Sequence, residues 1–204
     1  METAADRLHN NNYKAIALTL KAYAFSVLTD TFGDIPMEEA LLAEDGIWYP
    51  KYSEQKTIYP LLIDYLETAN DLYDVEENLA YVEDILFHND IAKWKKFTNS
   101  LHLRLLLRVS NRSEMDAYQR LSHILNNPEV YPIFNSLNDE AVLEVSGIPP
   151  LMSPWDRPQD FNSFRHVTEF FVDNLKHSED PRLPHFASTA KGQDNENYGY
   201  IGVP

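Results

Sequence analysis

The chain has 204 residues, of which 44% are hydrophobic and 24% are charged, and this composition excludes wholesale disorder. Its 17 lysine and arginine residues face 32 acidic residues, and the formal net charge of −15 argues against a nucleic-acid partner, since nucleic-acid binding needs a basic surface. The absence of cysteine excludes thiol catalysis, disulfide bonds and cysteine-bound zinc.

Apolar residues recur at spacings of three and four over residues 13–28, which predicts the first helix. Asn11 or Asn12 is expected to cap its N-terminus, because an asparagine oxygen can accept hydrogen bonds from free backbone N–H groups. Gly33 and Pro36 then stop the helix and are followed by extended chain.

A second helical face extends from Ser53 or Thr57 to Tyr73. If Thr57 is the N-cap, Pro60 lies in the first turn, where its missing N–H group costs little. If Ser53 is the N-cap, Pro60 lies deeper and a kink is expected. We favour the start at Ser53, with a distorted first turn.

The third helix, over residues 91–110, is apolar on most sides and is therefore expected to lie centrally, with Asp90 as its N-cap. Its main apolar stripe is Trp94, Phe97, Leu101, Leu105 and Val109. A fourth helix is predicted over residues 113–126, opened by a capping box between Ser113 and Asp116.

Helical periodicity fades over residues 129–160, where proline is frequent and residues 141–145 suggest a short strand. A fifth helix is expected over residues 162–176. The predicted fold is therefore mainly α, with tetratricopeptide-like helix pairs, long irregular loops and little strand. We expect one helical domain over residues 1–204.

The N-terminus indicates either a protein that stays in the cytoplasm or an excised piece of a longer one, and the C-terminus favours a chain cut before its fold is finished. The N-terminus lacks the basic and apolar regions of a secretory signal, and no segment approaches the ~18 consecutive apolar residues of a membrane-spanning helix. Residues 198–204 are aromatic and apolar, unlike an ordinary polar chain terminus. We therefore expect the helical domain to be incomplete in this sequence.

Several segments, in order along the chain, match the marks of a known family. They are residues 32–41 (FGDIPMEEAL), 51–69 (KYSEQKTIYPLLIDYLETA), 94–108 (WKKFTNSLHLRLLLR) and 180–183 (DPRL), with an aromatic–glycine segment at 198–200. In these segments the chain resembles the middle of a SusD/RagB-type protein, a surface-exposed nutrient-binding lipoprotein of Bacteroidetes.

The resemblance implies a function as well as a fold. It implies a non-catalytic subunit that captures oligosaccharide or another nutrient for a TonB-dependent, SusC-like outer-membrane transporter, with no cofactor. It also implies a surface-exposed location at the cell outer membrane, held there by a lipid anchor that this chain lacks. The alternative function is a helical-repeat scaffold for protein–protein interactions, and a glycoside hydrolase with a carboxylate pair is a third hypothesis.

Aromatic residues outside the helical stripes are the candidate ligand-binding residues. A flat aromatic ring can pack on the C–H face of a sugar, and neighbouring polar groups can bind its hydroxyls. The candidates are Trp48, Tyr49, Tyr52, Trp155, Asp156, Tyr198 and Tyr200. The alternative is that these aromatics only fix their loops to the helical scaffold.

Other polar patterns have ordinary structural interpretations. His166 and Glu169 lie three residues apart, but a zinc site needs a third protein ligand, so we predict no metal. We expect Asn99, which lies in the third helix, to have a structural role such as capping a neighbouring loop. Arg104, Arg108 and Arg112 recur every four residues, and we expect them to form ion pairs with acidic residues on neighbouring helices.

Overall fold

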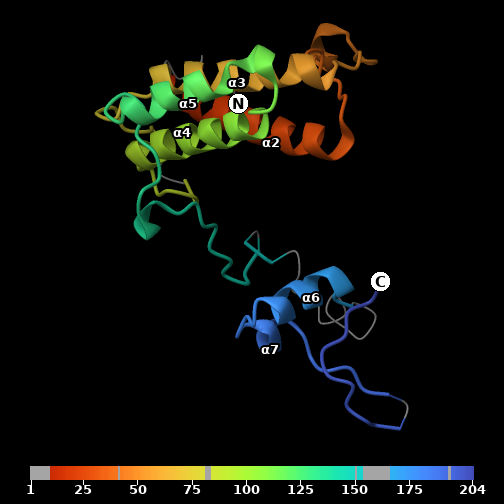
Figure 1. Ribbon diagram of the computed structural model, residues 1–204. Helices are drawn as coiled ribbons and strands as arrows, with labels where there is room; N and C mark the ends of the chain where they lie inside the picture. The colour runs from red at the N-terminus through yellow and green to blue at the C-terminus, as the bar shows by residue number, and fades with distance from the viewer. Residues whose placement is uncertain (1–9, 41, 81–83, 150, 154–165, 193) are drawn as a thin grey trace. The chain divides into compact units, whose positions relative to one another are not determined.

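The computed structural model describes residues 10–40, 42–80, 84–149, 151–153, 166–192 and 194–204, which fall into two compact units within residues 1–144 and 145–204. The first unit contains α2 (Asn11–Phe32), α3 (Gln55–Leu72), α4 (Ile91–Arg108) and α5 (Ala117–Asn126), and the second contains α6 (Glu169–His177) and α7 (Leu183–Phe186) (Figure 1). Pairing between extended segments is limited to isolated bridges in the described part of the chain. The mainly α prediction is confirmed, and the single-domain expectation stays a prediction.

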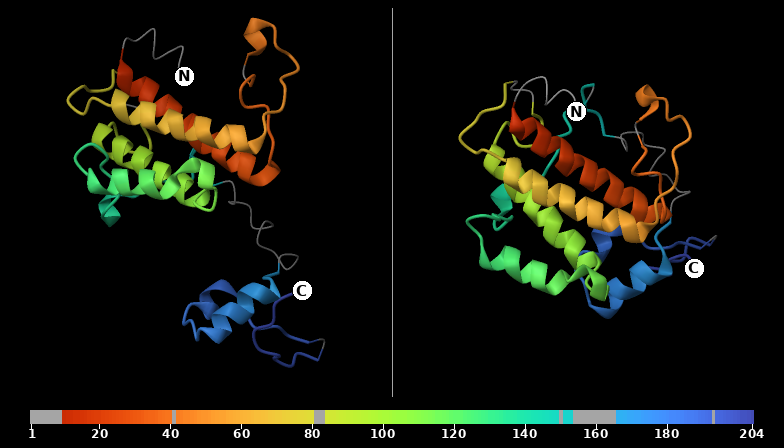
Figure 2. Two further views of the ribbon diagram at one scale, coloured as in Figure 1. Left: turned by 45° about the horizontal axis from the view of Figure 1, so that its top comes forward. Right: turned by 90° about the horizontal axis from the view of Figure 1, so that it is seen from above.

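The helices of the first unit form a bundle in which α2 and α3 are antiparallel (Figure 2). An antiparallel bridge between Ile35 and Ser53 joins the end of α2 to the start of α3. At the opposite end, Asn12 Nδ2 donates hydrogen bonds to the carbonyls of Asp74 and Glu77, each at 2.8 Å. The α4 helix packs on α3 and α2, and α5 packs on α4.

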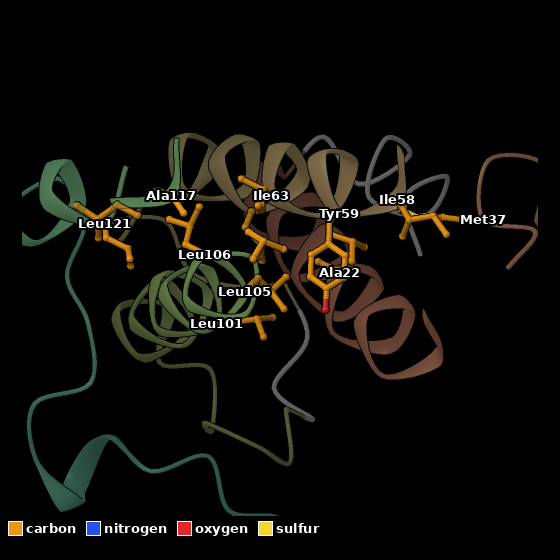
Figure 3. Close-up of a cluster of buried hydrophobic side chains, with 14 of the residues drawn as sticks. Ala22, Met37, Ile58, Tyr59, Ile63, Leu101, Leu105, Leu106, Ala117 and Leu121 are labelled. Atoms are coloured by element: carbon orange, nitrogen blue, oxygen red, sulfur yellow. The ribbon is translucent and has the colours of Figure 1, made fainter. Parts of the chain in front are cut away.

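Apolar side chains from α2 to α5 fill the interior of the bundle (Figure 3). Ile58, Leu62 and Leu66 of α3 and Leu106 of α4 are completely buried. A second cluster surrounds Trp94, which is 4% exposed and packs edge-on against Phe87 at 5.1 Å between ring centroids. The predicted burial of the α4 stripe is confirmed for Trp94, Leu101, Leu105 and Val109, and Phe97 is partly buried.

Buried polar side chains in the bundle hydrogen-bond with one another. Thr19 Oγ1 lies 2.7 Å from Thr98 Oγ1, and both hydroxyls lie within 3.2 Å of the Tyr73 hydroxyl. Asn99 Nδ2 donates to Asn70 Oδ1 and to the Pro132 carbonyl, each at 3.0 Å. The expected structural role of Asn99 is confirmed.

The ends of two helices differ from the prediction. The N-cap of α2 is Asn10, which accepts hydrogen bonds from the backbone N–H groups of Asn12 and Tyr13, so the expectation of Asn11 or Asn12 was wrong by one residue. Asn12 is used instead to tie α2 to the chain after α3. Asp90 caps α4 as predicted, accepting from Lys93 N at 3.0 Å.

The start of α3 differs from both predicted N-caps, Ser53 and Thr57. Its N-cap is Glu54, and neither Ser53 nor Thr57 caps it, because Ser53 is used in the bridge to Ile35. The N–H group of Gln55 is satisfied by Asp34 Oδ1 at 2.9 Å, a partner distant in sequence. Pro60 lies inside the helix.

Three further expectations for the region after α4 were wrong. Residues 113–115 form a short 3-10 helix (Ser113–Met115), and Asp116 adopts a left-handed conformation, so no capping box forms there. Residues 141–145 are not a strand. The fifth predicted helix begins at Glu169 with Thr168 as its N-cap, while residues 162–165 lie outside the described residues.

The second unit contains two short helices and a C-terminal segment. Val203 forms a parallel bridge with Thr168, which places the last residues beside the start of α6. Phe171 and Phe186 contact edge-on at 5.7 Å between ring centroids, joining α6 to α7.

Among the described helices of the whole chain, none is both long enough and apolar enough to cross a bilayer.

Candidate functional site

Three of the candidate aromatics lie in one loop between α2 and α3. We call residues 34–54 the aromatic loop, which projects from one end of the bundle (Figure 2). Trp48, Tyr49 and Tyr52 are 72%, 94% and 73% exposed, so none of them fixes the loop to the bundle by burial. Three large aromatic side chains exposed in one short segment are available to contact a ligand or another surface.

The base of the aromatic loop is held by hydrogen bonds. Ile35 and Ser53 exchange backbone hydrogen bonds of 3.3 and 2.9 Å. Ser53 Oγ donates to Glu38 Oε2, and the backbone N–H group of Lys51 donates to Glu39 Oε2, both at 2.8 Å. The two ends of the loop are therefore tied to each other, while its aromatic side chains remain exposed.

A polar cleft of about 540 Å³ lies at the same end of the bundle, and we call it the basal cleft. It is formed by the end of α2, the start of α3, the end of α4 and the turn that follows α4. Its lining residues are Asp30, Gln55, Lys56, Tyr59, Arg108, Val109, Arg112, Glu114 and Met115. Gln55 and Lys56 directly follow the aromatic loop in the sequence, and both line the cleft. The cleft therefore begins where the loop ends.

Asp30 organises one wall of the basal cleft. Its Oδ1 accepts a hydrogen bond from the Tyr59 hydroxyl at 2.5 Å, and its Oδ2 lies 3.2 Å from Arg108 Nη2. Burial, followed by the hydrogen bond to Asp30, raises the pKa of Tyr59 to about 12, so Tyr59 remains a neutral donor. The ion pair confirms the expectation for Arg108.

Two of the remaining candidate aromatics, Tyr198 and Tyr200, belong to the second unit. Tyr198 is 53% exposed, and its backbone N–H group donates to the Ala190 carbonyl. Trp155 and Asp156 lie outside the described residues.

A buried histidine was missed by the sequence analysis. His102 on α4 is completely buried, and neither ring nitrogen has a hydrogen-bond partner among the described residues. It lines a second polar cavity, of about 430 Å³, where its Nδ1 lies 3.7 Å from Glu67 Oε2. Burial, and then the positive charge of Arg120, lower the pKa of His102 to about 4. The imidazole is therefore neutral near pH 7 and makes no ion pair with Glu67 there.

The residues of the basal cleft were also missed as a group. Asp30, Tyr59 and Arg108 belong to three different helices, and only the antiparallel packing of those helices brings their ends together. The sequence signal that could have found this cleft is a pair of polar side chains, one in the last turn of a helix and one in the first turn of the next helix.

Within the described residues, no group of three or more histidine and acidic side chains is placed to hold a metal ion.

A family model described as SusD-like, starch-binding and associating with the outer membrane matches residues 1–204. A comparison with curated proteins finds no match.

Solved structures show the same fold. A SusD homologue from Bacteroides fragilis NCTC 9343 is 25% identical, with a TM-score of 0.78 over 95% of this chain and 41% of its own. An outer-membrane protein of Bacteroides vulgatus ATCC 8482, assigned to nutrient binding, is 28% identical, with a TM-score of 0.74 over 90% of this chain and 40% of its own. A chitin-binding protein is 26% identical, with a TM-score of 0.70 over 95% of this chain and 42% of its own. The chain thus spans about two fifths of the length of these structures.

Proposed function

The chain belongs to the SusD-like family, and from this premise we propose that the protein is a non-catalytic, surface-exposed subunit of the outer membrane that captures oligosaccharide. The captured ligand passes to a SusC-like, TonB-dependent transporter. The observation that carries the proposal is the aromatic loop, in which Trp48, Tyr49 and Tyr52 are exposed above a fixed base. One of the similar structures is described as nutrient-binding and another as chitin-binding, and the second description supports a sugar as the ligand.

The proposed binding mode follows from the chemistry of aromatic rings. The rings of Trp48, Tyr49 and Tyr52 offer flat apolar surfaces for the C–H faces of sugars, and a fixed loop base lowers the entropy lost when ligand binds. Asp34, Glu38 and Glu39 hold the base of the loop through hydrogen bonds. Trp155, Asp156, Tyr198 and Tyr200 are proposed as additional contacts.

The test is a binding assay of the intact protein on a glycan array, followed by titration calorimetry with a glycan that binds. Trp48→Ala and Tyr52→Ala should each weaken binding by about thirtyfold, the effect of removing a ~2 kcal/mol hot spot. Their melting temperatures should not change, because both side chains are already exposed.

The matched control is Tyr118→Ala, which removes a similarly exposed aromatic ring, 68% exposed, from α5. It should leave both affinity and melting temperature unchanged. Binding at wild-type strength in the two loop variants would show that the aromatic loop is not the ligand site, and absence of any glycan binding would contradict the proposed function.

A further inference from the structure

The residues that line the basal cleft include more cationic than anionic side chains, unlike the chain as a whole. Its lining contains three cationic side chains, Lys56, Arg108 and Arg112, and two anionic ones, Asp30 and Glu114. The chain carries a formal net charge of −15. The carboxylates of Glu54 and Asp34 also act on Lys56, so the cationic groups that remain for a ligand are chiefly the guanidinium groups of Arg108 and Arg112.

The cations of the cleft are only partly neutralised by the protein. Arg108 shares the Asp30 carboxylate with the Tyr59 hydroxyl, and the Arg108 side chain remains 59% exposed. Lys56 pairs with Glu54 at 2.6 Å, but both side chains are more than half exposed, and such pairs contribute little. Arg112 forms no ion pair with any described residue, so its guanidinium is available to a ligand.

We propose that the basal cleft binds the acidic group, a carboxylate or a sulfate, of an oligosaccharide whose sugar rings stack on the aromatic loop. This inference rests on the proposed function and specifies its substrate class. A guanidinium binds such oxyanions through two parallel N–H···O hydrogen bonds, which makes arginine the favoured partner for them. Two guanidinium groups are available in the cleft. That of Arg108 is held in place by its contacts with Asp30 and Tyr59, and Arg112 supplies the second.

The position and size of the cleft agree with this ligand. The cleft begins at Gln55 and Lys56, immediately after the aromatic loop, and the bridge of Ile35 to Ser53 fixes the loop base beside it. A volume of about 540 Å³ is within the usual range of small-molecule sites and has room for an acidic sugar unit. One oligosaccharide chain can then contact the loop with neutral rings and the cleft with an acidic ring.

The test measures affinities of the intact protein for three sets of oligosaccharides: neutral galacto-oligosaccharides, carboxylated oligogalacturonides and sulfated carrageenan oligosaccharides. We expect at least one acidic set to bind about tenfold or more tightly than the neutral set, which corresponds to one charge-assisted hydrogen-bonded contact. Preference for the carboxylated set identifies a carboxylate as the acidic group, and preference for the sulfated set identifies a sulfate.

The variant Arg112→Gln should remove this preference while leaving affinity for the neutral set unchanged. Lys56→Gln, a second exposed position in the cleft, should reduce the preference in the same direction. The matched control is Arg104→Gln, which removes an exposed arginine of α4 that does not line the cleft and should change neither affinity.

The outcomes separate the two proposals. Neutral binding that depends on Trp48, without any preference for acidic ligands, would overturn the inference and leave the proposed function intact. Equal loss of neutral and acidic binding in Arg112→Gln would also overturn it, since that pattern indicates a general disturbance. If none of the three sets binds and the glycan array is also empty, the proposed function fails and the inference fails with it.

Discussion

The bundle of α2 to α5 and the second unit are held together in different ways. In the bundle, apolar residues from four helices are buried in two clusters. In the second unit, the buried apolar side chains among the described residues are Val172 and Leu183. Its order depends instead on local contacts, such as the ion pair of Arg182 with Asp180 at 2.6 Å and the bridge of Thr168 to Val203.

This difference indicates how the free energy of unfolding is distributed. Each fully buried large apolar side chain contributes about 1.5–3 kcal/mol, whereas an exposed ion pair contributes up to about 1 kcal/mol. The bundle should therefore open only in global unfolding, and the second unit should open locally at a much lower free energy. Three predictions, in order of decreasing effect, test this contrast.

The largest effect is expected at the centre of the bundle. Trp94→Ala should lower the free energy of unfolding by about 3–5 kcal/mol, because the indole is buried and its Nε1 donates to Asp84 Oδ2 at 2.8 Å. Urea denaturation followed by circular dichroism measures the loss. Trp94→Phe, which keeps most of the volume but not the hydrogen bond, should lose less.

The counterpart of this variant in the second unit is Val172→Ala, which truncates the most deeply buried side chain of α6. It should speed hydrogen exchange in α6 and leave the denaturation midpoint of the bundle unchanged. A midpoint shift as large as that of Trp94→Ala would show that the two units unfold as one.

An intermediate effect is expected from His102 as the pH falls. The pKa of His102 is about 4 in the folded bundle and 6.5 when exposed, so between these values the unfolded chain binds a proton that the folded chain does not. The stability of the bundle should therefore be fully present above pH 6.5 and fall by on the order of 3 kcal/mol as the pH approaches 4. Below pH 4 this contribution should no longer change.

The measurement compares denaturation of the wild type and His102→Gln from pH 7.5 to 4. Other groups also titrate in this range, so the difference between the two proteins reports His102 alone. We expect that difference to shift in favour of His102→Gln as the pH falls. If the stability of the two proteins changed in parallel with pH, His102 would not change its protonation on unfolding. Hydrogen exchange in α6 should not depend on His102 at any of these pH values.

The smallest effect is expected from removing one helix cap in each region. Asp90→Ala removes the cap of α4 and should lower the free energy of unfolding of the bundle by about 1 kcal/mol. Thr168→Ala removes the cap of α6 and should increase exchange in α6 alone. Hydrogen exchange monitored by mass spectrometry distinguishes these outcomes, and a global effect of Thr168→Ala would contradict the contrast.

The sequence predicted the bundle well because burial there follows the helical period. The apolar positions of α2, α3 and α4 recur every three or four residues, and most of the corresponding side chains are buried or partly buried, whereas Leu28 and Leu107 are exposed. Helix ends were predicted less well where the partner is distant in sequence. The start of α3 is fixed by Asp34 and by the bridge of Ser53 to Ile35, and no local pattern around Ser53 or Thr57 contains that information.

The candidate site was predictable only in part for the same reason. Trp48, Tyr49 and Tyr52 could be selected because they lie outside any helical stripe, and the structure places all three on the surface. Asp30, Arg108 and Arg112 could not be combined into a cleft, because they meet only after three helices pack. The buried position of His102 was equally hidden, since a polar residue within an apolar helix has no periodic signature of its own.

The bridge between Ile35 and Ser53 also has an evolutionary consequence. Because this bridge and the contact of Asp34 with Gln55 close the loop at its base, the intervening segment is insulated from the helices that support it. The entropy of closing a loop rises only slowly with its length, so insertions and replacements between Glu39 and Lys51 should be tolerated at little cost to folding. The sequence of this loop can thus vary while the supporting scaffold stays the same.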